Sequence, residues 1–209
     1  MSEELQKLTE LFIKFPGIGP RQAKRFVYFL LNQPPTLTKE IATRLSRIHS
    51  DISQCKSCFR YFPSFAKPTE GRQGQICDHC ADLNVDEGVL IVVEKDIDLD
   101  ALKKLRGLSA KFFVLGGLIP ILEKESERKV RIKELEKTVK STKELKEIIL
   151  AFSANPGGDH TIDVLREMLY PTLEASQIKL SILGRGLSTG TELEYSDSDT
   201  LESAFQNRS

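Results

Sequence analysis

Four cysteines in two pairs constrain this chain more than any other feature of its sequence. They are the only cysteines among 209 residues, and they form the motifs Cys55-Lys56-Ser57-Cys58 and Cys77-Asp78-His79-Cys80. Each motif places two thiolates on one tight turn, and two such turns at this spacing are typical of a tetrahedral zinc site. Because four protein ligands leave no position open for water, we predict one structural Zn²⁺ rather than a catalytic ion.

Two other interpretations of the cysteines are weaker. A pair of disulfides would require an oxidising compartment, and nothing in the sequence indicates one. His79 could replace a cysteine as a ligand, but with four thiolates available we expect it to be a bystander. The first residues lack a secretory signal, and no apolar run approaches the ~18 residues of a membrane span. We therefore expect a soluble, cytoplasmic protein with reduced cysteines.

The charges of the chain are unevenly distributed. Thirty basic and thirty acidic residues cancel overall. Residues 1–60 nevertheless hold ten Lys/Arg against five Asp/Glu, and residues 186–209 hold five acids against one arginine. A basic head and an acidic tail are compatible with a nucleic-acid face at one end.

The basic head contains the pattern of a helix-hairpin-helix. Apolar residues recur at helical spacing from Leu5 to Phe15, stop at Pro16-Gly17-Ile18-Gly19-Pro20, and resume from Ala23 to Leu30. Gly17 and Gly19 can adopt backbone angles closed to other residues, and a proline suits the first turn of the second helix. We expect Ile18 to plug the small core.

This hairpin predicts a phosphate-binding site. Its backbone N–H groups lie beside a helix N-terminus, where a phosphate is bound without any base being read. Arg21, Lys24 and Arg25 open the second helix and are candidates to neutralise neighbouring phosphates. We therefore assign Gly17, Gly19 and these three cations to DNA binding. The alternative is a helical hairpin whose basic residues are merely solvated.

Aromatic side chains are crowded between the cysteine motifs. A third helix, with Ile41 to Ile52 at helical period, leads to Cys55, and Phe59, Tyr61, Phe62 and Phe65 follow. We expect these aromatics to pack over the zinc site, because so short a loop cannot form a core without the ion. A base-stacking platform is the alternative.

Residues 89–183 alternate between strand and helix. Apolar runs predict strands at 89–93, 112–115, 148–152 and 178–183, and helical periods occur at 98–105, within 123–147 and around 162–169. This alternation predicts a mostly parallel sheet. Glu94 and Asp159 follow two of its strands, and ligands gather at such carboxyl ends. The glycine-rich stretch 184–190 lacks the residues of a P-loop, so we expect a turn leading to an edge element.

The ordered set of motifs resembles the RecR family of bacterial recombination proteins. The segments that carry the resemblance are FPGIGPRQAKR, the four cysteines, VVEKD, LGG, SANPGGD and GRGLSTGTELEYSDSDTL, and they extend over nearly the whole chain. The resemblance implies a multidomain α/β protein with a helix-hairpin-helix domain (1–53), a C4 zinc finger (54–82), a Toprim domain (86–184) and a C-terminal assembly segment (185–209).

The resemblance also implies a function. It implies recombinational repair at single-strand gaps, with RecO, and in many bacteria RecF, helping to load RecA. Members form ring-like homo-oligomers that encircle DNA and catalyse no reaction of their own. The family's DNA-contacting basic positions correspond here to Arg21 and Arg25.

A rival hypothesis is a metal-dependent Toprim enzyme, such as a primase or nuclease, in which acidic residues hold Mg²⁺ over a phosphodiester. Glu94 and Asp159 can bind Mg²⁺ weakly, but the second coordinating pair is missing, since Asp96-Ile97-Asp98 follows Glu94 directly. We therefore predict that Mg²⁺ is not required and that Glu94 and Asp159 receive a basic protein partner. A zinc module without a DNA role would leave the hairpin and its cations unexplained.

Overall fold

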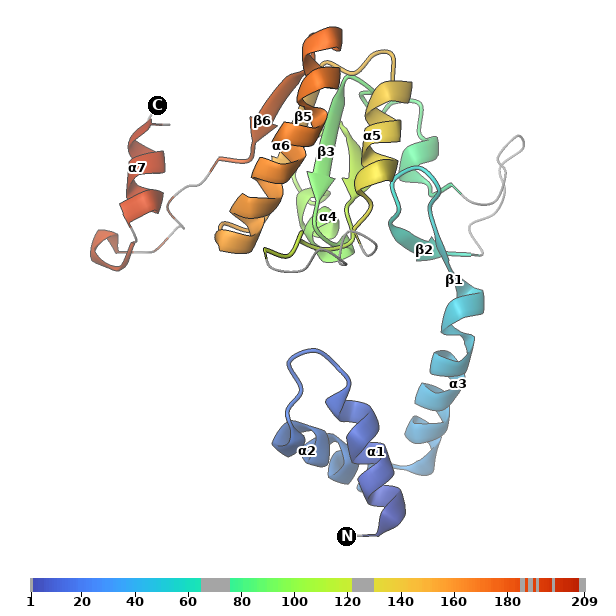
Figure 1. The fold of residues 1–209 in the computed structure, drawn as a ribbon. Coiled ribbons are helices and arrows are strands. Elements are labelled where there is room, and N and C mark those ends of the chain that lie inside the picture. The colour runs from blue at the N-terminus through green and yellow to red at the C-terminus, as the bar shows by residue number, and fades with distance from the viewer. Residues whose placement is uncertain are drawn as a thin grey trace. The chain divides into compact units, whose positions relative to one another are not determined.

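The chain divides into two compact units, Met1–Ile52 and Ser53–Ser209 (Figure 1). The structure is a computed structural model that describes residues 2–64, 76–121, 130–184, 187, 190, 192–196 and 198–206. No helix within these ranges is both long and apolar enough to cross a membrane.

Three helices form the N-terminal unit: α1 (Glu3–Ile13), α2 (Pro20–Leu31) and α3 (Pro35–Asp51). Helix α1 carries two acids in its first turn, which the positive end of the helix dipole favours. Helix α2 begins at a proline. Proline has no backbone N–H, which is no loss at this position because the first N–H of a helix has no intrahelical acceptor. The helix, hairpin and second helix predicted from the apolar spacing are confirmed.

The core of this unit is thinner than the apolar pattern suggests. Only Thr9, Ala23 and Val27 are buried among its described residues, and the ring of Phe12 lies 5.8 Å from that of Phe26. Ile18 is half-buried. Several large apolar side chains remain more than half exposed, namely Leu11, Phe15, Tyr28, Phe29, Leu31 and Leu45. The spacing therefore identifies the helices correctly, but most of the apolar residues do not meet within one copy of the unit.

The second unit is built on a four-stranded sheet in the order β4-β3-β5-β6. Its strands and helices alternate as β3 (Val89–Val93), α4 (Asp96–Leu102), β4 (Lys111–Val114), α5 (Ile132–Ser141), β5 (Glu147–Ala151), α6 (Pro156–Ser176) and β6 (Lys179–Ile182). All three strand pairings are parallel, and Val92 lies opposite both Phe113 and Leu150. The predicted parallel α/β fold is confirmed.

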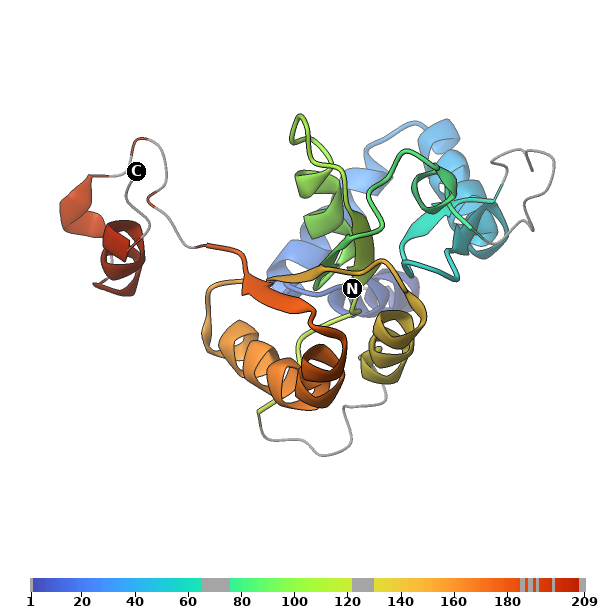
Figure 2. The same cartoon turned by 90° about the horizontal axis from the view of Figure 1, so that it is seen from above.

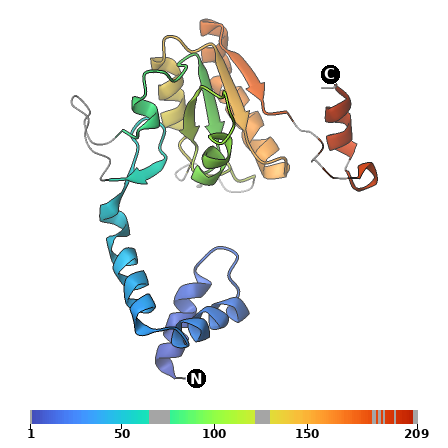
Figure 3. The same cartoon turned by 180° about the vertical axis from the view of Figure 1, so that it is seen from behind.

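Helices cover both faces of this sheet (Figure 2). On one face Val92 and Ile148 pack with Leu135 of α5 and Leu165 of α6. On the other face, which is turned toward the viewer in Figure 3, Ile91 packs with Leu99 of α4 and its neighbours. Burial on both faces explains why the strands read as continuous apolar runs rather than as alternating ones.

Two further segments complete the second unit. A small sheet pairs β1 (Ile52–Gln54) with β2 (Tyr61–Pro63), and a 3₁₀ turn, η1 (His79–Ala81), contains the end of the second cysteine motif. In the described part of the tail, the structure has a second 3₁₀ turn, η3 (Leu193–Tyr195), and helix α7 (Ser198–Gln206). The turn and edge element predicted for the tail therefore correspond, among the described residues, to a 3₁₀ turn and a helix, because the 198–206 segment has the period of an amphipathic helix.

Candidate metal centre and nucleic-acid interface

The four cysteines meet in one cluster. Their Sγ atoms all lie within 4.8 Å of one another, and no other described group of three or more His, Cys, Asp or Glu side chains is so placed. The thiols are free, and the sulfurs of Cys58 and Cys77 are 3.6 Å apart. A disulfide would require about 2.05 Å. Zn–S bonds of about 2.3 Å in a tetrahedron place the sulfurs about 3.8 Å apart, so the cluster fits a zinc ion.

Backbone turns bring the sulfurs together. In the first motif the N–H of Cys55 donates to the carbonyl of Arg60 (2.8 Å), and the N–H of Phe59 donates to the carbonyl of Cys55 (3.0 Å). Phe59 closes this turn with φ of 63°, an unusual angle for an aromatic residue. The N–H of Cys77 donates to Sγ of Cys55 (3.4 Å), which links the second motif to the first.

The thiols cannot all ionise at neutral pH without a cation. The neighbouring thiol of Cys55 is the main cause that raises the pKa of Cys58, and it likewise raises the pKa of Cys80. Cys55, Cys58 and Cys77 are buried, which further disfavours isolated thiolates. A divalent ion supplies the positive charge that lets four thiolates coexist. Cys80 is only partly buried, and it lines a cavity of about 420 Å³ between this cluster and α5.

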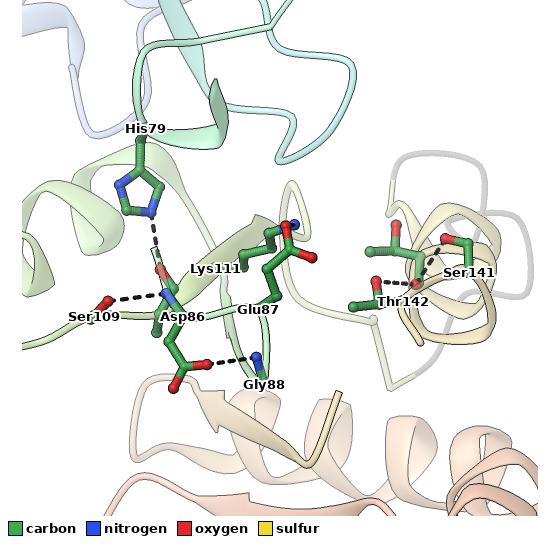
Figure 4. A network of polar contacts seen from close by, with 10 residues as sticks. His79, Asp86, Glu87, Gly88, Ser109, Lys111, Ser141 and Thr142 are labelled. Atoms are coloured by element: carbon green, nitrogen blue, oxygen red, sulfur yellow. Dashed lines mark hydrogen bonds and ion pairs between the residues drawn. The ribbon is translucent and has the colours of Figure 1, made fainter. Parts of the chain in front are cut away.

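The side chain of His79 contacts β4 and the residue before it. Its Nε2 atom donates to the carbonyl of Ala110 at 3.0 Å (Figure 4), and its ring lies 5.2 Å from that of Phe112. Among the described residues it belongs to no ligand group, in agreement with its expected role as a bystander. Its contact ties the second cysteine motif to the amino end of β4.

The first cysteine motif is tied to the same strand. The N–H of Val114, the last residue of β4, donates to the carbonyl of Cys58 at 2.8 Å. The ring of Phe59 packs edge-on against Phe113 at 5.2 Å, and the guanidinium of Arg131 lies over the Phe59 ring, 5.3 Å from its centroid. The cysteine module, here the described residues 54–64 and 76–82, therefore covers the outer edge of β4, and the cysteine cluster and the sheet share one compact unit.

The aromatic residues of the module divide between two roles. Phe62 packs with the cysteines, as expected. The expectation is wrong for Phe59, which packs on the sheet, and for Tyr61, which is 58% exposed and donates its N–H to Asp96 Oδ1 (2.7 Å). The spacing of aromatics along a loop does not specify which of two adjoining cores each ring enters. Phe65 lies outside the described residues.

Close to the cavity, polar groups fix the segment that leads into β3. Figure 4 shows Lys111 and Glu87 directed toward one another, with their charged atoms 2.5 Å apart. Asp86 accepts the N–H of Gly88, and its own N–H donates to Ser109. The contacts of Lys111 with Glu87 and of Ser109 with Asp86 hold the amino ends of β3 and β4 together.

The hairpin of the N-terminal unit has the geometry of a phosphate cradle. Gly17 has φ of 77°, and Gly19 is the N-cap of α2, with no side chain bonded to the helix N–H groups. The first N–H groups of a helix have no intrahelical acceptor, so they are available to an anion. Arg21, Lys24 and Arg25 are exposed on the first two turns. None of the three has an ion-pair partner within the described ranges.

The positive φ of Gly17 gives a testable consequence. Gly17→Ala is expected to destabilise the N-terminal unit by about 1–2 kcal/mol, because an L-residue with a Cβ is strained in the left-handed region. No neighbouring atom lies within 4 Å of the added methyl group, so backbone strain alone is measured. Gly19→Ala is the matched control: its φ of −85° is ordinary, and losing a glycine N-cap is expected to lower stability by less than about 1 kcal/mol. Equal losses in thermal unfolding of the two variants would contradict this account of the turn.

The two acids predicted at the carboxyl edge lie after adjacent strands. Glu94 directly follows β3, Asp159 is in the first turn of α6 after β5, and β3 pairs with β5. Glu94 is only 7% exposed and forms an ion pair with Lys95 at 2.5 Å. Asp159 is half-buried. The carboxyl edge of the sheet therefore exposes less carboxylate surface than the sequence suggests, and it also carries the cation Lys95.

Sequence reasoning missed three side chains that shape these sites. Arg131 donates to the carbonyl of Val114 (2.9 Å), and its guanidinium lies over the ring of Phe59. It therefore supports the contact between the cysteine module and the sheet. Gln54 and Arg60 carry buried donor atoms without a hydrogen-bond partner in the described structure. No local pattern marks them, because their burial depends on how the two cysteine motifs fold together.

Comparisons with known proteins agree with this architecture. The family model described as "Toprim domain" matches residues 89–183, "RecR, helix-hairpin-helix" matches 5–49, and "RecR, C-terminal" matches 186–209. Recombination protein RecR of Prochlorococcus marinus (strain MIT 9312) is 33% identical over 207 residues, which cover 99% of this chain and 96% of that protein. The RecR of Synechococcus sp. (strain CC9605) is 34% identical over 204 residues (98% of each chain). The RecR of Lactobacillus acidophilus is 29% identical over 201 residues (96% and 94%). Because two RecR family models match its ends and relatives at 33% and 34% identity cover nearly its whole length, the chain belongs to the RecR family of recombination proteins.

Proposed function

We propose that the protein is a zinc-stabilised DNA-binding clamp and adaptor of recombinational repair, without a reaction of its own. The observation that carries the DNA role is the exposed trio Arg21, Lys24 and Arg25 beside an uncapped helix N-terminus. Such a surface binds the phosphates of any sequence, since phosphate contacts carry no base information. The name of the relatives, recombination protein, gives the cellular process.

The zinc ion has a structural role in this proposal. Cys55, Cys58, Cys77 and Cys80 would hold it, and four thiolates would leave no open position for a reacting water. Its contribution is to fold the module that covers β4. The ion therefore affects the sheet and whatever the sheet binds, but not a bond-breaking step.

Self-association belongs to the same proposal. In a single chain, several large apolar side chains of the N-terminal unit are more than half exposed. The same holds in the tail for Leu193, Tyr195 and Phe205. Extended apolar surface of this kind is typical of interaction sites. A ring-like homo-oligomer, a dimer or tetramer, would cover it and would place several hairpins around one DNA.

Catalysis by a Toprim metal centre is the second candidate function. It requires several carboxylates around Mg²⁺. Asp96 and Asp98 instead accept backbone N–H groups, of Tyr61 and Lys95 respectively, and α4 begins with them. Glu94 already pairs with Lys95. These contacts favour an adaptor role for the edge.

A gel-shift assay beside nuclease and primer-synthesis assays tests the proposal. The protein is expected to shift DNA with and without Mg²⁺ while leaving the length of the DNA unchanged. Cleavage or synthesis that requires Mg²⁺ and disappears in Glu94→Gln would support the enzyme instead.

We propose that the acidic edge docks RecO, with RecF as a further partner, in the step that loads RecA. Replacing Glu94 by Gln and Asp159 by Asn is expected to weaken association with RecO while folding, zinc content and DNA binding persist. The loss should be greater at low salt, where charge pairing is least screened. Calorimetric titration with RecO measures this loss of affinity. Glu167→Gln is the control, because Glu167 is an exposed acid on α6, the helix that also carries Asp159. Undiminished affinity in the double variant would remove this edge from the docking surface.

A further inference from the structure

Arg60 carries a buried guanidinium nitrogen that has no hydrogen-bond acceptor. Its side chain is 16% exposed, and Nη1 has no hydrogen-bond partner in the part of the chain that the structure describes. Its closest charged contact is Asp78 Oδ1 at 3.7 Å, beyond hydrogen-bond distance, and the Asp78 side chain is 74% exposed. A solvated carboxylate at that distance compensates little of the energy lost when a guanidinium leaves water.

The position of Arg60 relates it to both cysteine motifs. Its carbonyl accepts the N–H of Cys55 in the first motif. The tip of its side chain reaches Asp78, which lies between Cys77 and His79 in the second motif. Gln54, the residue before Cys55, also has a buried donor, Nε2, without an acceptor. Both unsatisfied donors thus belong to residues that adjoin the first cysteine motif, and Arg60 also reaches the second motif.

The charge of the loaded metal centre explains these donors. Four thiolates and one Zn²⁺ carry a net charge of −2, and three of the four cysteines are buried. Buried charge is stable only when compensated, and an unsatisfied buried donor lowers stability by about 1–3 kcal/mol. A weakly paired cation is therefore costly beside neutral thiols and favourable beside a dianionic centre.

We infer that Arg60 is the counter-charge of the zinc–tetrathiolate centre. The inference rests on the proposed zinc site. Arg60 would not contact the ion; it would stabilise the charged ligands and so set how firmly the ion is held. Residues that support metal ligands in this way typically change metal affinity by 10–100-fold.

Three variants separate the charge of Arg60 from its bulk. Arg60→Met keeps much of the apolar volume and removes the charge, so zinc affinity is expected to fall by about 10–100-fold. Arg60→Lys keeps the charge and is expected to recover most of that loss. Lys56→Met is the matched control, because Lys56 is an exposed cation inside the first motif, and solvent screens its charge. Its zinc affinity should remain near that of the parent.

Competition with a chromophoric chelator measures the affinities on the full-length protein, and the sulfur-to-metal charge-transfer band of the Co²⁺-loaded protein provides a spectroscopic readout. A shifted band in Arg60→Met, restored in Arg60→Lys, is expected. If Arg60→Met binds zinc as tightly as the parent, or if Arg60→Lys is the weaker of the two, the inference is wrong and Arg60 acts only by packing. If the parent protein holds no zinc, the metal assignment itself fails.

Discussion

A Cys77→Ser protein is expected to be recovered without zinc and with the edge of its sheet unfolded. A structural zinc ion contributes on the order of 10 kcal/mol to the folding of its module, whereas a whole domain is stable by only about 5–15 kcal/mol. Serine cannot provide the fourth thiolate, and the change also removes a buried sulfur that lies 3.6 Å from that of Cys58. The loss of the ion therefore exceeds what the remaining contacts can compensate.

The damage should extend beyond the cysteines. The module bonds to both ends of β4, through the carbonyl of Cys58 and the ring of His79. Without it, the N–H of Val114 loses its acceptor and the edge of β4 is uncovered. The amides of residues 111–114 are therefore expected to exchange their hydrogens faster than in the parent protein. The solubility of the protein should also fall, since an open edge strand promotes aggregation.

Ser57→Ala provides the control for this prediction. Ser57 is exposed within the first motif and offers no ligand atom to the cluster. Its variant should keep one zinc per chain and normal exchange in β4. A Cys77→Ser protein that remains soluble, with β4 protected as in the parent, would show that the ion does not maintain this fold.

The second large effect concerns DNA. Arg21→Ala combined with Arg25→Ala is expected to lower affinity for every DNA sequence alike. Each charge-assisted contact contributes about 1.5 kcal/mol or more, so each arginine is worth about tenfold at low salt. Because fewer counterions are released on binding, the slope of log affinity against log salt should flatten by up to about two units.

A matched pair of arginines on α3 tests whether the site or the mere charge matters. Arg44 and Arg47 belong to the same unit, but each forms an ion pair with an acid of its own helix, Glu40 at 2.8 Å and Asp51 at 3.3 Å. Replacing both by Ala should alter affinity and salt slope much less. Equal losses in the two double variants would indicate that the hairpin is not the binding face.

Sequence patterns predict the elements of this protein well because each pattern has a local cause. The apolar run Val89–Val93 becomes β3 since both faces of the sheet are covered. The glycines of the hairpin fit a turn that needs φ of 77° at Gly17. Helix α4 begins at Asp96 rather than at 98, because the side chain of Asp98 accepts the N–H of Lys95 and starts the helix earlier.

The less predictable features depend on contacts between distant segments. The ring of Phe59 packs against the sheet rather than over the cysteines, since its turn directs the ring toward Phe113 and Arg131. Glu94 is buried and paired with Lys95, although it reads as an open strand-end acid. The burial of Arg60 arises only when both cysteine motifs are folded. Periodicity and spacing carry no information about such long-range packing.

The DNA-binding role is tested most directly by fluorescence anisotropy of the unaltered protein with two labelled DNAs of unrelated sequence, titrated from about 50 to 200 mM salt. We expect binding to both DNAs with the same affinity, a steep and equal loss of affinity as salt rises, and unchanged DNA length when Mg²⁺ is present. An affinity that does not change with salt concentration, a strong preference for one sequence, or no binding at the lowest salt would contradict the proposed DNA-binding role.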